Sequence, residues 1–492
     1  MSDEGLAQLP ALKVINADDS QHVRNLPPGY LPKEERKTIL LLSDDLRMPS
    51  GVGVMSREIV IGTAHKYNWI QLGAGINHPD QGKIIDLSPA VINETGIPDP
   101  YVRVYPYNGY GDTQIIRYLL MAEKPNAIMH FTDPRYWIWL YHMEAEIREA
   151  LPITFYHVWD DLPFPKYNEN FYRSCDAIAC ISKQTYNIVK NVWKKEPKLE
   201  PWQLKYIPHG VDGEQFFYKI TKEDELKNCA EYRKQMFGGE DVEFAVLYNN
   251  RNIRRKMPGD VVLAFKEFVK KLPKEKADKC RLVFHTQPVD DNGTDIPAVI
   301  RDCAPEIKVI FSTDRVPPNI LNYIYNNVDV VMNLASNEGF GLGTLEAIMA
   351  ERMIVVNITG GLQDQMGFVD ENGDYLDPDK HFGKNWGSNH DGRYKKCGEW
   401  GIPVFPAQRA LAGSPLTPYI FDDRCKWEDA AIALKTIYDM SNEERERRGK
   451  LGREYAMDQG YNNKAMSQSF IDFFETTFAN WKPRHRWGIF KS

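Results

Sequence analysis

The sequence predicts an α/β protein with two Rossmann-like, doubly wound domains, and three observations support this prediction. Short apolar runs alternate with amphipathic segments along most of the chain, which is the pattern of repeated β-α units. The runs fall into two series separated by a charged stretch. The chain has 492 residues, more than one hydrophobic core usually serves. We therefore expect two domains that face each other across a cleft.

The first series of apolar runs predicts an N-terminal domain over residues 37–220, after a polar leader over residues 1–36. A turn or a helical segment follows each run, so we expect the strands to be parallel. The runs are TILLLS, WIQLG, AIMHF, ITFYHV, AIACIS and LKYIPH.

The second series predicts a C-terminal domain over residues 242–462, after a linker over 221–241. Its runs are EFAVLYN, CRLVFHT, KVIFS, VDVVMNL and MIVVNI. Residues 370–424 are rich in Gly, Pro and aromatic residues, and we expect them to form an ordered excursion. Residues 463–492 predict an amphipathic helix with a basic tail. Because ligands bind beyond the carboxyl ends of the strands in open α/β sheets, those ends are the candidate sites.

Composition places the chain among soluble globular proteins, with 42% apolar and 26% charged residues. The net charge of −7 does not indicate nucleic-acid or peripheral membrane contact, although local basic stretches leave both open. Seven irregularly spaced cysteines predict reduced thiols rather than a disulfide framework. The acidic N-terminus and the lack of long apolar runs favour a cytoplasmic protein.

The stretch NEGFGLG, residues 337–343, has the composition of a phosphate-binding turn between a strand and a helix. Its glycines let the backbone approach a ligand closely, and the N–H groups at a helix start favour anionic oxygens. Glu338 and Glu346 flank the turn and would repel a phosphate. They can instead accept hydrogen bonds from the hydroxyls of a sugar or a ribose. A phosphate between two hydroxyl-rich groups indicates a nucleotide sugar.

This Glu-x7-Glu pattern, followed by Gly360 and Gly361, resembles that of the retaining GT-B glycosyltransferases, which include sucrose and glycogen synthases and bacterial mannosyltransferases. The resemblance implies the GT-B fold, with an acceptor-side first domain, a nucleotide-sugar-binding second domain, and a final helix that crosses back to the first. Further motifs agree in order: PSGVGVMSREI (49–59), CDAIACISKQT (175–185), YIPHGVD (206–212) and NNRNIRRKMPGDVVLAF (249–265).

The resemblance implies roles for individual residues around the donor. Glu338 would hold hydroxyls of the transferred sugar, and Glu346 would bind the ribose. Arg251 and Lys256 would neutralise the diphosphate as charge develops on the leaving group. His157 would contact the donor sugar from the first domain.

The resemblance also implies that the first domain closes a glycine loop over the diphosphate. No metal and no other cofactor is expected, because basic residues and helix N-termini would stabilise the leaving group. Asp160 is the nearest rival of His157, and Met257 replaces the glycine expected after the loop lysine. The nucleotide-binding residues predicted are Gly51, Gly53, Gly339, Phe340, Gly341, Leu342 and Glu346.

Each assignment has a structural alternative. A glutamate near a helix start can complement the helix dipole, and Arg251 and Lys256 can belong to a solvated basic loop. The glycines at 51 and 53 can form an ordinary strand-to-helix turn, and His157 can be a satisfied core histidine. Three acidic pairs favour solvated turns or helix caps over metal sites: Asp44 with Asp45, Asp160 with Asp161, and Asp422 with Asp423.

We therefore expect a retaining glycosyltransferase that moves a sugar from a nucleoside diphosphate sugar to an acceptor hydroxyl. One alternative is a GT-B nucleotide-sugar epimerase or hydrolase. The other is a sugar-nucleotide-binding protein without catalysis. The sequence does not select the nucleobase, the sugar or the acceptor, which can be a saccharide, a lipid, a small molecule or a modified nucleic acid base.

Overall fold

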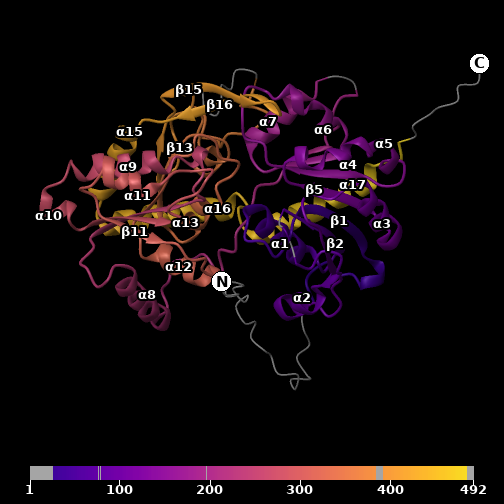
Figure 1. Cartoon of the computed structure of the whole chain (residues 1–492), viewed down its shortest axis with the longest axis horizontal. Coiled ribbons are helices and arrows are strands. Elements are labelled where there is room, and N and C mark those ends of the chain that lie inside the picture. The colour runs from indigo at the N-terminus through magenta and orange to yellow at the C-terminus, as the bar shows by residue number, and fades with distance from the viewer. Residues whose placement is uncertain (1–25, 76, 78, 195–196, 384–391, 485–492) are drawn as a thin grey trace, which may run out of the picture. The chain divides into compact units, whose positions relative to one another are not determined.

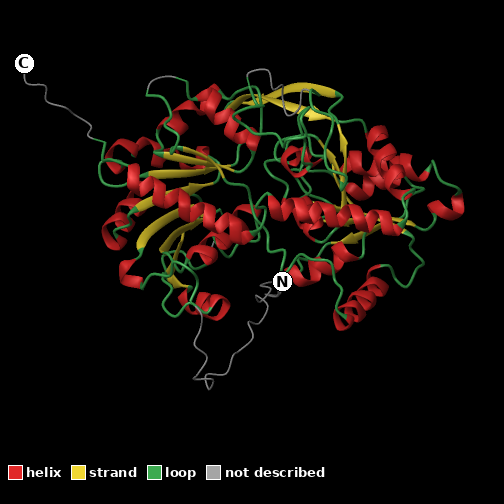
Figure 2. Ribbon diagram, turned by 180° about the vertical axis from the view of Figure 1, so that it is seen from behind, coloured by secondary structure: helices red, strands yellow, loops and turns green. Residues whose placement is uncertain are grey.

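The computed structural model of the chain is an α/β protein built on two mainly parallel sheets (Figures 1 and 2). Within the described residues, one sheet has eight strands, the other has six, and there is a two-stranded antiparallel ribbon. The predicted fold class is therefore confirmed. Most of the predicted leader and the basic tail lie outside the described residues, which are 26–75, 77, 79–194, 197–383 and 392–484.

The described chain divides into two compact units. Two of the four boundaries fall within strands of the eight-stranded sheet, β6 (Ile153–His157) and β7 (Ala177–Cys180). The other two follow residue 173 and residue 466. The predicted domain limits at residues 220 and 242 stay a prediction. The first unit holds the described residues up to 156, 174–178 and those from 467 onward; the second holds 157–173 and the described part of 179–466.

The eight-stranded sheet has the order β3-β4-β2-β1-β5-β6-β7-β8. Strand β1 pairs in parallel with β2 and β5, and the short β3 is antiparallel to β4. The centre of β1 is a run of four apolar residues, ILLL, all buried, as expected for a strand that is covered on both faces. The other strands, apart from β6 and β7, are β1 (Lys37–Asp44), β2 (Tyr67–Ala74), β3 (Ile85–Asp86), β4 (Val102–Pro106), β5 (Ala127–Phe131) and β8 (Leu204–Tyr206).

The C-terminal helix α17 (Asn463–Asn480) packs through aromatic side chains onto the first unit. Phe474 makes edge contacts with Tyr67 and Trp69 of β2, with ring centroids 5.4 and 6.0 Å away. The Tyr67 hydroxyl donates to Glu475 at 2.8 Å. These contacts anchor the end of the described chain to β2. The other helices of this unit are α1 (Gly51–Thr63), α2 (Ser88–Thr95), α3 (Thr113–Glu123), α4 (Ile138–His142) and α5 (Glu144–Ile147).

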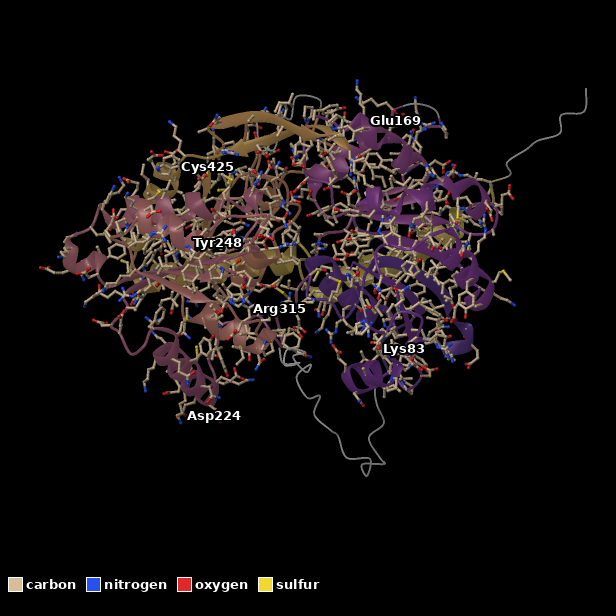
Figure 3. The ribbon with its side chains drawn as sticks, in the orientation of Figure 1. Lys83, Glu169, Asp224, Tyr248, Arg315 and Cys425 are labelled. Atoms are coloured by element: carbon tan, nitrogen blue, oxygen red, sulfur yellow. The ribbon has the colours of Figure 1, made fainter. Side chains whose placement is uncertain are left out.

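The six-stranded sheet of the second unit has the order β11-β10-β9-β12-β13-β14 and is parallel throughout its described pairs. Alternate residues of β9, among them Phe244 and Tyr248, join the core that α9 and α15 cover. Tyr248, labelled in Figure 3, is fully buried. The strands are β9 (Phe244–Asn249), β10 (Cys280–His285), β11 (Val309–Ser312), β12 (Val330–Asn333), β13 (Met353–Asn357) and β14 (Gly401–Val404).

Helices with identifiable caps connect the strands of the second unit. Ser182 caps α7 and Ser441 caps α16, and each side chain accepts a backbone N–H from the first turn. The helices are α6 (Glu169–Arg173), α7 (Lys183–Val192), α8 (Glu223–Met236), α9 (Pro258–Val269), α10 (Lys274–Ala277), α11 (Ile296–Cys303), α12 (Pro318–Asn326), α13 (Leu342–Met349), α14 (Leu362–Gln365), α15 (Trp427–Tyr438) and α16 (Asn442–Asp458).

Three segments contain elements that the sequence did not indicate. The stretch named as a linker holds helix α8, whose Arg233 donates to the carbonyl of Asn327. The excursion over 370–424 contains β14 and the ribbon of β15 (Gln408–Ser414) and β16 (Thr417–Arg424), with 384–391 outside the described residues. Strand β4 was absent from the predicted runs, because its sequence, VRVYP, places a charge among few apolar residues.

Candidate active site in the second unit

The glycine-rich turn leaves β12 and enters α13, as its composition predicts. Gly341 is the N-cap of α13 and has φ +92°, a backbone conformation that favours glycine. A Cβ at Gly360 would lie 1.8 Å from the carbonyl oxygen of Glu338. The N–H of Gly361 donates to that carbonyl at 3.0 Å. The two segments are therefore packed backbone to backbone, and there is no room for a side chain at Gly360 or Gly361.

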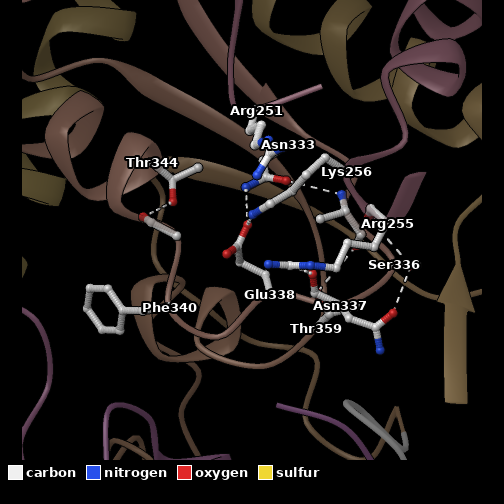
Figure 4. Close-up of polar contacts among 12 residues, drawn as sticks. Arg251, Arg255, Lys256, Asn333, Ser336, Asn337, Glu338, Phe340, Thr344 and Thr359 are labelled. Carbon is white, nitrogen blue, oxygen red and sulfur yellow. Dashed lines mark hydrogen bonds and ion pairs between the residues drawn. The ribbon is translucent and has the colours of Figure 1, made fainter. Parts of the chain in front are cut away.

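The carboxylate of Glu338 lies at this turn and is almost fully buried, with 6% of the residue exposed. It forms an ion pair with the ammonium of Lys256 and accepts a hydrogen bond from Asn333 Nδ2 at 3.3 Å (Figure 4). Burial would raise the pKa of Glu338, but the charges of Lys256 and Arg255 outweigh it and lower the pKa. Burial lowers the pKa of Lys256 despite the nearby carboxylate. The site thus holds a buried pair of opposite charges.

The loop that carries Lys256 is held by a buried asparagine. Asn252 Nδ2 donates to the carbonyls of Gln287, Pro288 and Thr294, at 3.1, 3.2 and 2.7 Å. A short 3-10 turn over Arg254–Lys256 follows, and Met257 ends it at φ +51°. The residue that replaces the expected glycine therefore keeps the left-handed backbone that a glycine would favour.

Sequence reasoning missed Arg255, which lies beside the turn. Its Nη1 donates to the carbonyl of Asn337 at 2.6 Å, and its own carbonyl accepts the N–H of Ser336 at 2.8 Å. Burial lowers the pKa of Arg255, but the carboxylates of Asp160 and Glu338 raise it overall. The basic loop is visible in the sequence, but which of its arginines lies near Glu338 depends on the path of the 3-10 turn.

Arg251, the arginine that the resemblance selects, is 67% exposed at its side chain, and its Nε lies 3.4 Å from Asp290. In Figure 4 it lies above Lys256 and Asn333. Its role at a diphosphate stays a prediction.

Two adjacent aspartates, Asp160 and Asp161, also reach the turn. The Asp160 side chain comes within 4.0 Å of the positions that a Cβ would take at Gly339 and Gly360. Asn337 Nδ2 donates to Asp161 Oδ1. Burial raises the pKa of both carboxyls, and the neighbouring Asp160 raises that of Asp161 further.

The expectation that the acidic pairs lie in solvated turns is wrong for one member of each pair. Asp161 is buried, and Asp45 and Asp423 are fully buried against arginines, Arg47 at 2.7 Å and Arg409 at 2.8 Å. The sequence did not show these partners, because local spacing does not reveal which cation neutralises a buried carboxylate. No group of three or more His, Cys, Asp or Glu residues in the described part of the chain is arranged to hold a metal ion.

Glu346 lies in the middle of α13 and accepts a hydrogen bond from the hydroxyl of Tyr325 at 2.6 Å. Asn249 Nδ2 in turn donates to that hydroxyl at 2.7 Å. Burial raises the pKa of Glu346 to about 7, although the Tyr325 hydrogen bond opposes the shift. The contact of Glu346 with a ribose stays a prediction.

His157 is 1% exposed, and its Nε2 lies 2.7 Å from the hydroxyl of Tyr172. Asn168 Nδ2 donates to the same hydroxyl at 3.3 Å. This geometry is that of the core-histidine alternative, and the contact of His157 with a donor sugar stays a prediction. Phe340 is buried and packs against His209, with ring centroids 5.2 Å apart.

Gly51 and Gly53 lie in the first unit, in the first turn of α1. The N–H of Gly53 donates to Ser50 Oγ at 3.0 Å, and Ser50 Oγ donates to Asp44 at 2.6 Å. A Cβ at Gly53 would lie 2.5 Å from the carbonyl oxygen of Met48. A side chain at position 53 would therefore clash with the backbone, which accounts for Gly53. The contact of both glycines with a diphosphate stays a prediction.

No family model matches the chain, and no curated protein matches its sequence. Solved structures do match in fold. A sucrose-phosphate synthase from Thermosynechococcus elongatus superposes with a TM-score of 0.63 at 16% identity, over 90% of this chain and 100% of that one. Anabaena HepE in complex with UDP and glucose gives 0.60 at 14%, with the same coverage. A glycosyltransferase from Rickettsia africae gives 0.58 at 12%, over 91% and 100%.

These likenesses show that the chain shares the fold of GT-B glycosyltransferases, as its motifs led us to expect. At such low identities they show the fold alone. Within the described ranges, no helix combines the length and the apolar character that a membrane span requires.

Proposed function

We propose that the protein is a retaining glycosyltransferase that uses a nucleoside diphosphate sugar as donor. The observation that carries this proposal is the buried pair of Glu338 and Lys256 at a glycine turn, with Glu346 on the helix that the turn begins. The start of α13 can bind the phosphates of a ligand through its free N–H groups. Glu338 and Glu346, one on each side of this helix start, can then accept hydrogen bonds from hydroxyls on the two sides of the phosphates. The fold shared with HepE, which was solved with UDP and glucose, supports the same choice.

In this proposal the diphosphate lies over the start of α13. The backbone N–H groups of Leu342 and Gly343 bind its oxygens, since the first N–H groups of a helix lack partners within it. Lys256 and Arg255 face the oxygen that gains charge as the bond to the sugar breaks. Fixed cations in a desolvated site stabilise such charge strongly.

Glu338 holds hydroxyls of the sugar, and its pairing with Lys256 keeps it ionised as an acceptor of their hydrogen bonds. Glu346 accepts hydroxyls of the ribose, with Tyr325 holding one of its oxygens in place. The acceptor hydroxyl attacks on the face that the leaving group departs from. Its proton passes to the departing phosphate oxygen, so no general base on the protein is required.

The experiment that tests this proposal is calorimetric titration of the full chain with UDP-glucose and with GDP-, ADP- and TDP-sugars. We expect one donor to bind the wild type and to bind Lys256→Met at least about tenfold more weakly, the value of one lost charge-assisted contact. Lys270→Met, which removes an exposed lysine paired with Glu267, is the matched control.

Turnover is then followed as release of the nucleoside diphosphate in the presence of candidate acceptors. Binding without release in any acceptor mixture would favour a sugar-nucleotide-binding protein. Release without transfer, or conversion of the sugar, would favour a hydrolase or an epimerase. Absence of binding to every nucleotide sugar by the folded protein would refute the proposal.

A further inference from the structure

A polar cavity lies in the second unit, at the amino ends of β12 and β13. Its volume is about 740 Å³, within the range of small-molecule sites. Helix α13 begins at the glycine turn and ends beside this cavity, so the cavity lies at the opposite end of that helix from Glu338. The helices around it, α8, α12, α15 and α16, are labelled in Figure 1.

Three arginines in its wall surround one carboxylate. Arg445 lies 3.5 Å from Asp329, which also accepts the N–H of Ala245 at 2.8 Å. The charges of Arg352 and Arg233 act on the same carboxylate. The carboxylate of Asp329 therefore interacts with three guanidinium groups and accepts one backbone hydrogen bond.

Two of these arginines have carbonyl acceptors but no carboxylate of their own. Arg233 donates to the carbonyls of Asn327 and Val242, at 3.0 and 2.7 Å. Arg352 donates to the carbonyl of Ala350 at 3.1 Å. Among the residues that the structure describes, no carboxylate lies within 4.0 Å of either guanidinium. The nearby Asp329 is paired with Arg445 instead.

The other carboxylates of the wall are mostly paired with lysines. Glu243 binds Lys276 and Lys279, at 3.0 and 2.7 Å, and Glu446 binds Lys219 at 2.7 Å. Glu351 is the exception, and its charge acts on Arg352. The wall thus presents two guanidinium groups without a directly paired carboxylate, with further carboxylates and amides around them.

We propose that this cavity binds a phosphomonoester of a small polyhydroxylated molecule, with Arg233 and Arg352 holding the phosphate. A phosphate dianion matches two guanidinium groups in charge, and each can bind it through two parallel hydrogen bonds. The volume exceeds that of a bare phosphate, and the side-chain amide of Asn442 can bind hydroxyls of the rest of the ligand. This site is separate from the proposed donor site and does not depend on it.

Calorimetric titration of the full chain at constant ionic strength tests this proposal, with glucose 6-phosphate and inorganic phosphate as probes. We expect glucose 6-phosphate to bind more tightly than inorganic phosphate. Arg233→Gln and Arg352→Gln should each weaken its binding about tenfold, as expected for one lost charge-assisted contact. Glu351→Gln should strengthen it, because a negative charge beside the phosphate is removed.

The gain in Glu351→Gln cannot come from misfolding, which makes it the decisive variant. Arg301→Gln, which removes an exposed arginine paired with Asp302, is the control and should bind as the wild type does. Three outcomes would overturn the proposal: equal affinities for the two probes, affinities unchanged in all three cavity variants, or binding abolished by Lys256→Met, which would place the phosphate in the donor site.

Discussion

The ammonium of Lys256 and the carboxylate of Glu338 form a buried ion pair between residues 82 positions apart in the chain. One comes from the 3-10 turn after β9 and the other from the glycine turn after β12, which neighbours β9 in the sheet. Parallel order brings the carboxyl ends of these strands to the same edge of the sheet. That edge is where an open α/β sheet binds its ligands.

Lys256→Met should destabilise the protein by about 3 kcal/mol, because it leaves the Glu338 carboxylate buried without its partner. The double variant with Glu338→Gln should recover part of this loss, since no unpaired charge remains, but not donor binding. Urea denaturation of the two single variants and the double variant measures the coupling. Strictly additive losses would mean that the two side chains do not stabilise each other in the folded protein.

Gly360→Ala should cost several kcal/mol of stability and abolish donor binding, because its Cβ would overlap the Glu338 carbonyl and displace the turn. Gly259→Ala is the matched control. No atom lies within 4 Å of its Cβ position in α9, so the variant should be neutral or up to about 1 kcal/mol more stable. Thermal denaturation compares the two. A Gly360→Ala protein as stable as the wild type would disprove the packing argument.

Stability should fall as the pH rises from about 4.5 to about 7, in part through Glu346. Its pKa is raised from 4.5 to about 7 in the folded protein, so the folded state binds more protons than the unfolded state between these values. The contribution is complete below pH 4.5, is lost as the pH passes 7, and has an upper limit of about 3 kcal/mol.

Glu346→Gln isolates this contribution from those of other groups that titrate nearby in pH, such as Asp364, whose pKa burial raises to about 6. Unfolding free energies at pH 5, 6 and 7 should decline less steeply in the variant than in the wild type. Parallel curves for the two proteins would show that Glu346 has an ordinary pKa in the folded state.

Arg255→Gln should weaken nucleotide-sugar binding about tenfold, and Arg251→Gln by no more than about twofold. Arg255 interacts electrostatically with the carboxylates of Glu338 and Asp160. The Arg251 side chain, in contrast, is mostly exposed beside Asp290. Titration of both variants with the donor of the wild type makes the comparison. A larger loss in Arg251→Gln would restore the assignment made from family resemblance.

Much of this protein could be predicted from local sequence. Alternating apolar and amphipathic segments indicated two series of β-α units because burial on both faces of a parallel strand requires apolar runs. The glycine turn with Glu338 and Glu346 was also visible, because a strand, a turn and a helix start are adjacent in the chain. Strand β4 and helix α8 were missed where the apolar signal is weak.

By itself, then, the sequence determined the fold class, the turn and the two glutamates beside it, all of which depend on neighbours within about a dozen residues. The tertiary structure decided the rest of the site. It placed Arg255 against the turn, and it joined Asp161 to Asn337 across 176 residues. Such contacts depend on which strand ends share an edge of the sheet and on how each buried charge finds a partner, and no local pattern of residues encodes either.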